Sequence, residues 1–240
     1  PSDVITSPDF ASLAGKVNDI VGRACGQQPT PRPTPRPTPR PVIPVDTGNC
    51  GKADVMFLID SSGSIKETNP ADWDFVIRFL KDAIARLATI SNDVRFSIAT
   101  FSFEARLVFD LNQFRNVQDA INAVDTIPYI GSTTNIYDGL RIVRTQVIPG
   151  TRPDAARILI LMTDGKPNEQ VPLTEPEADA VKATGTRIVG IGVTRFIDED
   201  QLRRIATTPR DVITTPDFAS LAGRLNDIIG VACAPVVAPR

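Results

Sequence analysis

Residues 55–65 read VMFLIDSSGSI, an uninterrupted apolar run that ends in an acidic, hydroxyl-rich turn. With Asp54 in front, the run DVMFLID at 54–60 has the continuous hydrophobicity of a strand that is buried on both faces. Strands of this kind occur in parallel sheets that are covered by helices on both sides. The stretch therefore predicts an α/β fold, and the turn after it is the first candidate for a functional site.

Between residues 50 and 233, apolar strands alternate with segments of helical periodicity. Strands are predicted over 54–60, 94–101, 105–109, 157–162, 187–193 and 211–214. Helices are predicted over 73–87, 117–124, 136–147, 175–184, 198–206 and 217–231, the last with Pro216 and Asp217 at its N-terminus. The alternation predicts a doubly wound, mostly parallel six-stranded sheet with one antiparallel edge strand, at 105–109, and helices on both faces.

The composition excludes several classes of function. The chain has 240 residues and no His, which removes imidazole-based catalysis and His-ligated zinc. Its 26 basic and 28 acidic side chains give a net charge of -2, so nothing favours nucleic-acid binding. No apolar run approaches the roughly 18 residues that a membrane span requires. The first residues, PSDVITSPDF, lack the basic and apolar regions of a signal peptide.

Two distant segments of the chain repeat each other. Residues 1–26 match residues 209–234 at 19 of 26 positions without a gap. The second copy ends a long folded region, so we expect the first copy to be the tail of an earlier, truncated domain. Residues 27–47 contain eight prolines in a PTPR pattern and predict a stiff polyproline II linker of about 3.1 Å per residue. A ligand for a proline-binding module and a Thr-glycosylated stalk are the alternatives for this linker.

Three polar segments stand where loops leave the predicted sheet. They are DSSGS at 60–64, GSTTN at 131–135 and TDG at 163–165. Ligands of open parallel sheets bind beyond the carboxyl ends of the strands, so we expect these segments to converge. Carboxylate and hydroxyl oxygens suit Mg²⁺, Mn²⁺ or Ca²⁺. The alternation in 60–64 aims Asp60, Ser62 and Ser64 at one point, and we expect Gly63 to let the backbone bend there.

The charge of the candidate ligands is informative. Asp60 and Asp164 together neutralise one divalent cation, whereas the hydroxyls of Ser62, Ser64 and Thr134 add no charge. A cation held in this way stays electrophilic and accepts an external carboxylate. The sequence therefore indicates a site where a partner's acidic side chain completes the coordination.

The three segments, in this order and at these separations, resemble the von Willebrand factor A domain, also called the integrin inserted domain. The resemblance covers residues 48–234 as a complete domain, with 1–26 as the tail of a preceding A domain and 235–240 as a short tail. It implies a metal-ion-dependent adhesion site that binds Mg²⁺ or Mn²⁺. By position, it makes Asp60, Ser62 and Ser64 the first-loop ligands and Asp164 the third-loop ligand, often through water. Thr134, six residues before Leu140, becomes the second-loop ligand, with Thr133 as the nearby alternative.

The resemblance also bears on the three cysteines. Related extracellular domains often bridge their two ends, which implies a disulfide between Cys50 and Cys233. Such a bond closes a loop of about 180 residues and contributes roughly 4–5 kcal/mol in the loop-entropy model. Two reduced thiols are the alternative. Cys25 is the repeat equivalent of Cys233, so we expect it to be unpaired in this chain and prone to intermolecular pairing.

The functional hypothesis is a secreted module of the extracellular matrix that serves adhesion or assembly. Its partner is a matrix protein such as collagen, bound through the cation, and self-association is possible. The alternative is a structural building block whose metal site is vestigial or only stabilises the domain. A further hypothesis is that residues 1–26 pack onto another chain in place of its last helix. Without His, no nucleophile–base pair is visible, so we do not expect an enzyme.

Overall fold

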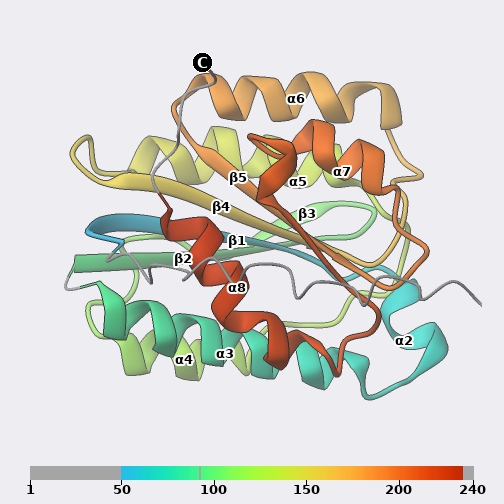
Figure 1. The fold of residues 1–240 in the computed structure, drawn as a ribbon, viewed down its shortest axis with the longest axis horizontal. Coiled ribbons are helices and arrows are strands. Elements are labelled where there is room, and N and C mark those ends of the chain that lie inside the picture. Colours follow the sequence, from blue (N-terminus) through green and yellow to red (C-terminus); the bar gives the residue numbers. More distant parts are fainter. Residues whose placement is uncertain (1–49, 92, 235–240) are drawn as a thin grey trace, which may run out of the picture. The chain divides into compact units, whose positions relative to one another are not determined.

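The computed structural model describes residues 50–91 and 93–234, which form a six-stranded sheet between two layers of helices (Figure 1). The spatial order is β3-β2-β1-β4-β5-β6, and only the edge strand β3 runs antiparallel to its neighbour. The predicted fold class is thereby confirmed. The strands are β1 (Lys52–Asp60), β2 (Asp93–Phe101), β3 (Ala105–Phe109), β4 (Ala156–Thr163), β5 (Arg187–Val193) and β6 (Val212–Thr215). Cys25, the repeat at 1–26, the linker at 27–47 and the tail at 235–240 lie outside the described residues.

Strand β1 lies in the middle of the sheet because it is apolar on both faces. Eight of its nine residues are buried, and it pairs in parallel with β2 on one side and with β4 on the other. Phe57 and its same-face neighbours contribute to one hydrophobic cluster, and Met56 and Leu58 contribute to the second. Strand β1 therefore separates the two hydrophobic cores.

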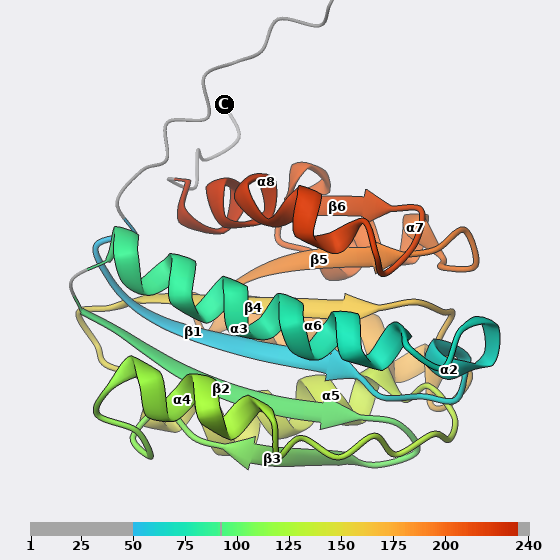
Figure 2. The same cartoon turned by 90° about the horizontal axis from the view of Figure 1, so that it is seen from below.

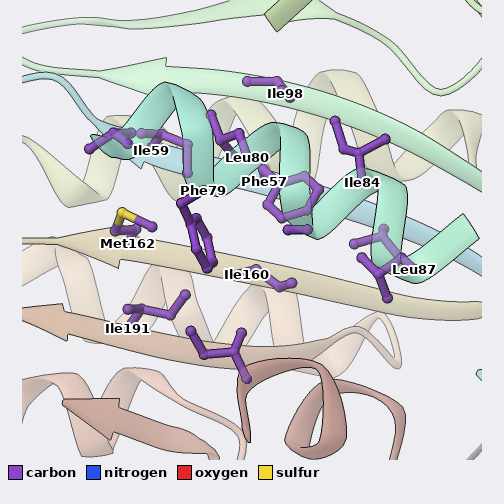
Figure 3. Close-up of a cluster of buried hydrophobic side chains, with 14 of the residues drawn as sticks. Phe57, Ile59, Phe79, Leu80, Ile84, Leu87, Ile98, Ile160, Met162 and Ile191 are labelled. Carbon is purple, nitrogen blue, oxygen red and sulfur yellow. The ribbon is translucent and has the colours of Figure 1, made fainter. Parts of the chain in front are cut away.

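The two faces are covered by different helices. The helices α3 (Asp72–Ile90), α4 (Val117–Val124) and α8 (Leu221–Cys233) cover one face (Figure 2). The helices α5 (Ile136–Ile142), α6 (Val171–Ala183) and α7 (Glu199–Ile205) cover the other. On the first face, Phe79, Leu80 and Ile84 of α3 pack over Phe57 and Ile160 of the sheet (Figure 3). Short elements complete the chain: α2 (Ser64–Thr68), a π-helical turn η1 (Val143–Val147), and the 3-10 turns η2 (Ile148–Gly150) and η3 (Pro209–Asp211).

Two helices begin four residues away from their predicted starts. Helix α6 begins at Val171, four residues before the predicted start, because Pro172 lies in the first turn, where its missing N–H costs nothing. Helix α8 begins at Leu221 instead of residue 217. The side chain of Asp217 accepts hydrogen bonds from the backbone N–H (2.8 Å) and hydroxyl (2.6 Å) of Ser220, which makes a turn of residues 217–220.

A disulfide joins the two ends of the domain. Cys50 precedes β1 and Cys233 is the last residue of α8; their Cα atoms are 4.7 Å apart and their sequence separation is 183 residues. This is the pairing that the resemblance implies. In the loop-entropy model a covalent loop of this length stabilises the fold by about 5 kcal/mol.

Candidate metal centre

The first loop begins at Asp60, the last residue of β1, which is only 1% exposed. Its Oδ1 accepts a hydrogen bond from the backbone N–H of Ser62 (2.8 Å), and its Oδ2 accepts one from the hydroxyl of Thr163 (2.7 Å). Thr163 ends β4, the strand next to β1. The parallel pairing of β1 and β4 thus brings the first and third loops to the same edge of the sheet.

The remaining first-loop residues connect Asp60 to Asp164. The hydroxyl oxygens of Ser62 and Ser64 are 3.1 Å apart, and the Ser64 hydroxyl donates to Oδ1 of Asp164 at 2.7 Å. Asp164 is 3% exposed. Four of the five predicted ligands, three from residues 60–64 and Asp164 from the third loop, are therefore connected by a chain of hydrogen bonds.

The fifth predicted ligand, Thr134, lies on the second loop. This loop is fixed to the first by two backbone hydrogen bonds, from Gly131 to Ser61 (2.8 Å) and from Gly63 to Ser132 (2.7 Å). Thr134 is 4% exposed, and its backbone N–H donates to Oδ1 of Asn168 on the third loop (2.8 Å). The structure thus places Thr134 at the junction of the three loops, and its hydroxyl makes no hydrogen bond to the other four candidates.

Thr133, the nearby alternative, differs in its surroundings. Its hydroxyl oxygen is buried and has no hydrogen-bond partner in the described part of the chain, while its carbonyl oxygen accepts from the Ser102 hydroxyl (3.2 Å). A buried hydroxyl without a partner is an incomplete site. Both threonines therefore remain candidates for the second-loop ligand.

Tyr129 is a further residue of the site that the sequence reasoning did not identify. Its hydroxyl lies 3.0 Å from the carbonyl oxygen of Ser62 and 3.1 Å from that of Gly63, so it holds the backbone of the first loop in place. Its ring packs against Trp73, with centroids 5.4 Å apart, and the ammonium of Lys66 lies 4.5 Å from its centroid. No motif in the sequence pointed to Tyr129, because only the fold brings it to the first loop.

The two glycines of these loops have different roles. Gly63 has φ -60°, which any residue adopts, so the expectation that it provides a special bend is wrong. Gly131 has φ +71°, a conformation that favours glycine, and a Cβ there would lie 3.0 Å from the Tyr129 ring. The glycine that the backbone conformation of the site requires is therefore Gly131 on the second loop.

The two carboxylates of the site have raised pKa values. Burial raises the pKa of Asp60 to about 6, against the hydrogen bonds that lower it. Burial and the charge of Asp60 raise the pKa of Asp164 to about 7. Both shifts have the same physical origin, which is negative charge held away from water without a positive group to balance it.

A comparison with the other buried acids shows how unusual this pair is. Within residues 50–91 and 93–234, five acidic side chains are buried. Asp54, Glu177 and Asp211 each form a salt bridge with at least one arginine. Asp60 and Asp164 form none in this part of the chain, although burying an unpaired charge is expensive. No basic side chain of the described residues therefore balances the charge of this pair.

The donor set fits a hard divalent ion. It offers two carboxylates and several hydroxyls, and it contains no sulfur or imidazole ligand. The described residues contain no group of three or more His, Cys, Asp and Glu side chains that could hold a metal. Coordination here would consequently depend on the serine and threonine hydroxyls together with the two carboxylates.

Comparison with known proteins agrees with the geometry. The family model of the von Willebrand factor type A domain matches residues 54–228. The chain belongs to this family. The A domain is 32% identical over 186 residues to the collagen alpha-6(VI) chain of Mus musculus, covering 77% of this chain and 8% of the relative. It is 28% identical to matrilin-1 of Gallus gallus, covering 73% of this chain and 36% of the relative.

Solved structures give the same family. Proximal thread matrix protein 1 from the mussel byssus superimposes with a TM-score of 0.71 and 31% identity, over 78% of this chain and 47% of that one. Another structure of the same mussel protein has a zinc-occupied MIDAS motif; it has a TM-score of 0.70 and 29% identity, over 96% of this chain and 54% of that one. The chain thus spans about half of the mussel protein and a small part of the collagen relative. None of the helices formed by residues 50–91 and 93–234 has the length and hydrophobicity needed to cross a bilayer.

Proposed function

We propose that this A domain is an adhesion or assembly module of the extracellular matrix that binds a protein partner, such as collagen, through a divalent cation. The ligands are Asp60, Ser62, Ser64, Thr134 and Asp164. The observation that carries the proposal is the pair Asp60 and Asp164, two buried carboxylates without the arginine that every other buried acid of the described chain has. Mg²⁺ is the expected ion, with Mn²⁺ and Ca²⁺ as alternatives, since all donors are oxygen atoms.

The residues of the site contribute to cation binding in different ways. Asp60 and Asp164 supply the negative charge, while Ser62, Ser64 and Thr134 supply neutral oxygen donors. When bound, the cation supplies a Lewis-acid centre that accepts a carboxylate of the partner. Tyr129 holds the carbonyl groups of Ser62 and Gly63, and this fixes the first loop before any ligand arrives.

The relatives and the disulfide support an extracellular location. The similar curated proteins include collagen chains and a matrilin, and the similar solved structures include a matrix protein of the mussel byssus. A disulfide between Cys50 and Cys233 persists in oxidising compartments and not in the cytosol. We therefore propose secretion into the extracellular matrix and a function in binding, not in catalysis.

A second candidate function is a structural building block in which the cation only stabilises the domain. One observation favours it: the side chains of the site already satisfy one another through the Ser64–Asp164 and Thr163–Asp60 hydrogen bonds. In that case a cation would raise the stability of the domain without creating affinity for a partner.

Binding to fibrillar collagen on a solid phase separates the two candidates. We expect the wild-type domain to bind in Mg²⁺ and to lose binding in chelator. Asp60→Ala should not bind under either condition. Asp154→Ala is the matched control, because Asp154 is an exposed aspartate that pairs with Lys52 far from the site, and it should bind like the wild type. Collagen binding that survives both the chelator and Asp60→Ala would contradict the metal-bridged function.

A further inference from the structure

The exposed apolar side chains of the domain gather around the candidate metal centre. In the described part of the chain, five large hydrophobic residues are exposed, and we call them the apolar collar: Phe103, Ile130, Val171, Leu173 and Phe196. Phe103 follows β2, Phe196 follows β5, and Val171 and Leu173 lie in the first turn of α6, which follows β4. Ile130 precedes Gly131, whose backbone N–H donates to Ser61 of the first loop. The parallel strands β1, β2 and β4 end on the side of the sheet next to α2 (Figure 2). Single exposed hydrophobics are common, but a group around one polar centre marks an interaction surface.

Hydrogen bonds connect the two aromatic members of the collar to the loops of the metal centre. The carbonyl oxygen of Phe103, in the turn between β2 and β3, accepts from Nδ2 of Asn135 (3.0 Å), the residue after Thr134. On the other side, the backbone N–H of Phe196 donates to the Thr194 hydroxyl (3.2 Å). That hydroxyl donates in turn to the carbonyl oxygen of Asp164 (3.0 Å). Phe103 and Phe196, exposed by 55% and 60%, therefore flank the site from opposite sides.

A groove of about 660 Å³ continues the surface on the Phe196 side. Its apolar lining comes from Phe196, Ile197, Pro216 and Phe218. The carboxylates of Asp72, Glu199 and Asp217 and the guanidinium of Arg195 also line it, and their net negative charge disfavours a second acidic group there. The groove suits one large apolar side chain of a ligand.

The strand order fixes the spacing of these subsites. The order β2-β1-β4-β5 places the ends of β2 and β5 on either side of the β1–β4 pair that leads to Asp60 and Asp164. Neighbouring strands lie about 4.8 Å apart, so each outer end is about 7 Å from the midpoint of the pair. In an extended peptide, residues i and i±2 point the same way and lie about 6.6–6.8 Å apart. The distance from the midpoint of the pair to each outer strand end therefore matches the distance between residues i and i±2 of an extended peptide.

One exposed basic side chain beside the site also favours an anionic ligand. Lys166 stands two residues after Asp164, is exposed, and forms no ion pair in the described part of the chain. We propose that the apolar collar recognises an extended segment of a partner protein in which an acidic residue has a large apolar residue two positions before it and two positions after it. The inference rests on the proposed function, because the acidic residue of the segment is the one that the cation accepts.

Synthetic peptides test the pattern directly. The probe is a fluorescent peptide of sequence GFGEGFG, with GSGEGSG as the matched control for the apolar residues and GFGQGFG as the control for the carboxylate. Fluorescence anisotropy in Mg²⁺ gives the affinities. We expect GFGEGFG to bind at least about tenfold more tightly than GSGEGSG, since burying one phenylalanine is already worth that factor. GFGQGFG should lose binding.

Variants of the collar locate the effect. Phe103→Ser and Phe196→Ser should each reduce the preference for GFGEGFG over GSGEGSG, and Leu173→Ser is a further variant should either one fold poorly. The rise in melting temperature on adding Mg²⁺ should stay as in the wild type. Arg115→Ser, at the opposite end of the sheet, should change neither quantity. Equal, carboxylate-dependent affinity for both peptides would overturn the collar and leave the proposed function standing, as would a preference that survives all three collar substitutions. The absence of Mg²⁺-dependent binding by either peptide would overturn the collar, while collagen binding with chelator and with Asp60→Ala decides the proposed function separately.

Discussion

Strand β1 carries a buried aspartate near each end, and the two have opposite surroundings. Asp54 is 0% exposed and accepts from the guanidinium groups of Arg95 (3.0 Å) and Arg152 (2.9 Å). Burial alone would raise the pKa of Asp54, but these hydrogen bonds outweigh it and lower the pKa. Asp60, 1% exposed, has only hydroxyl and amide partners, and its pKa is raised to about 6.

The difference assigns the two ends of the strand to different tasks. At Asp54 the chain supplies its own cations, so that end is a closed structural network. At Asp60 and Asp164 the described part of the chain supplies oxygen donors without positive charge, and we propose that a bound cation balances them. The same residue type is thus balanced by two arginines at one end of the strand and by no basic side chain of the described residues at the other.

The largest expected effect is the loss of stability on substituting Asp54, at the start of β1. Asp54→Asn leaves Arg95 and Arg152 without their buried anion and should destabilise the domain by about 3 kcal/mol. Urea unfolding measures the change. The exposed pair Lys52–Asp154 is the control, and Asp154→Asn should cost less than about 1 kcal/mol. Equal effects of the two substitutions would mean that the Asp54 network does not hold the strands together.

The pH dependence of stability should distinguish the two ends next. Asp60 and Asp164 have raised pKa values in the fold, so their contribution is fully present below about pH 4 and is lost as pH rises through 6 and 7. Asp54 has a lowered pKa, so its contribution is lost only as pH falls below about 4. In chelator, the domain should therefore be most stable near pH 4–5 and lose on the order of 3 kcal/mol by pH 7.5. A flat profile over this range would contradict unbalanced charge at the site.

The second loop offers a smaller effect that sharpens the ligand set. Thr134→Ala should weaken Mg²⁺ binding about tenfold, because one neutral donor is lost while both carboxylates remain. Calorimetric titration measures the affinity. Thr133→Ala is the matched control and should leave the affinity nearly unchanged. The reverse result would make Thr133 the ligand, in keeping with its buried hydroxyl that lacks a partner.

The smallest effect concerns the support of the first loop. Tyr129→Phe removes the hydroxyl that contacts the carbonyl groups of Ser62 and Gly63 and should weaken Mg²⁺ binding about fivefold, the equivalent of one hydrogen bond. Tyr137→Phe, on α5, serves as the matched control for the loss of a phenol group. If both variants bind Mg²⁺ like the wild type, Tyr129 does not position the loop.

The fold was predictable because its main signals are local. The continuous apolar run at 55–59 identifies a central strand, and β3, α4 and β5 have the predicted bounds. The starts of α6 and α8 were missed because Pro172 and Asp217 have meanings that depend on their exact place in a turn. The neighbouring residues in the sequence do not show at which position of a turn Pro172 or Asp217 stands.

The site was only partly predictable from the sequence. The spacing of DSSGS and TDG pointed to side chains that the structure brings together, since each segment begins at the last residue of a strand. Tyr129 and the Arg95–Asp54 pair could not be found in this way. Asp54 stands opposite Arg95 only through the register of β1 and β2, a long-range property that no local pattern contains.

The most direct test of the central claim, that a bound cation balances the charge of Asp60 and Asp164, is the melting temperature of the wild type and of Asp60→Asn with chelator and with millimolar Mg²⁺ at pH 7.5. The amide removes the unbalanced charge at nearly constant volume. In chelator, Asp60→Asn should melt at a higher temperature than the wild type. Mg²⁺ should raise the melting temperature of the wild type and leave that of the variant unchanged. A variant that melts lower in chelator and still responds to Mg²⁺ would contradict the account.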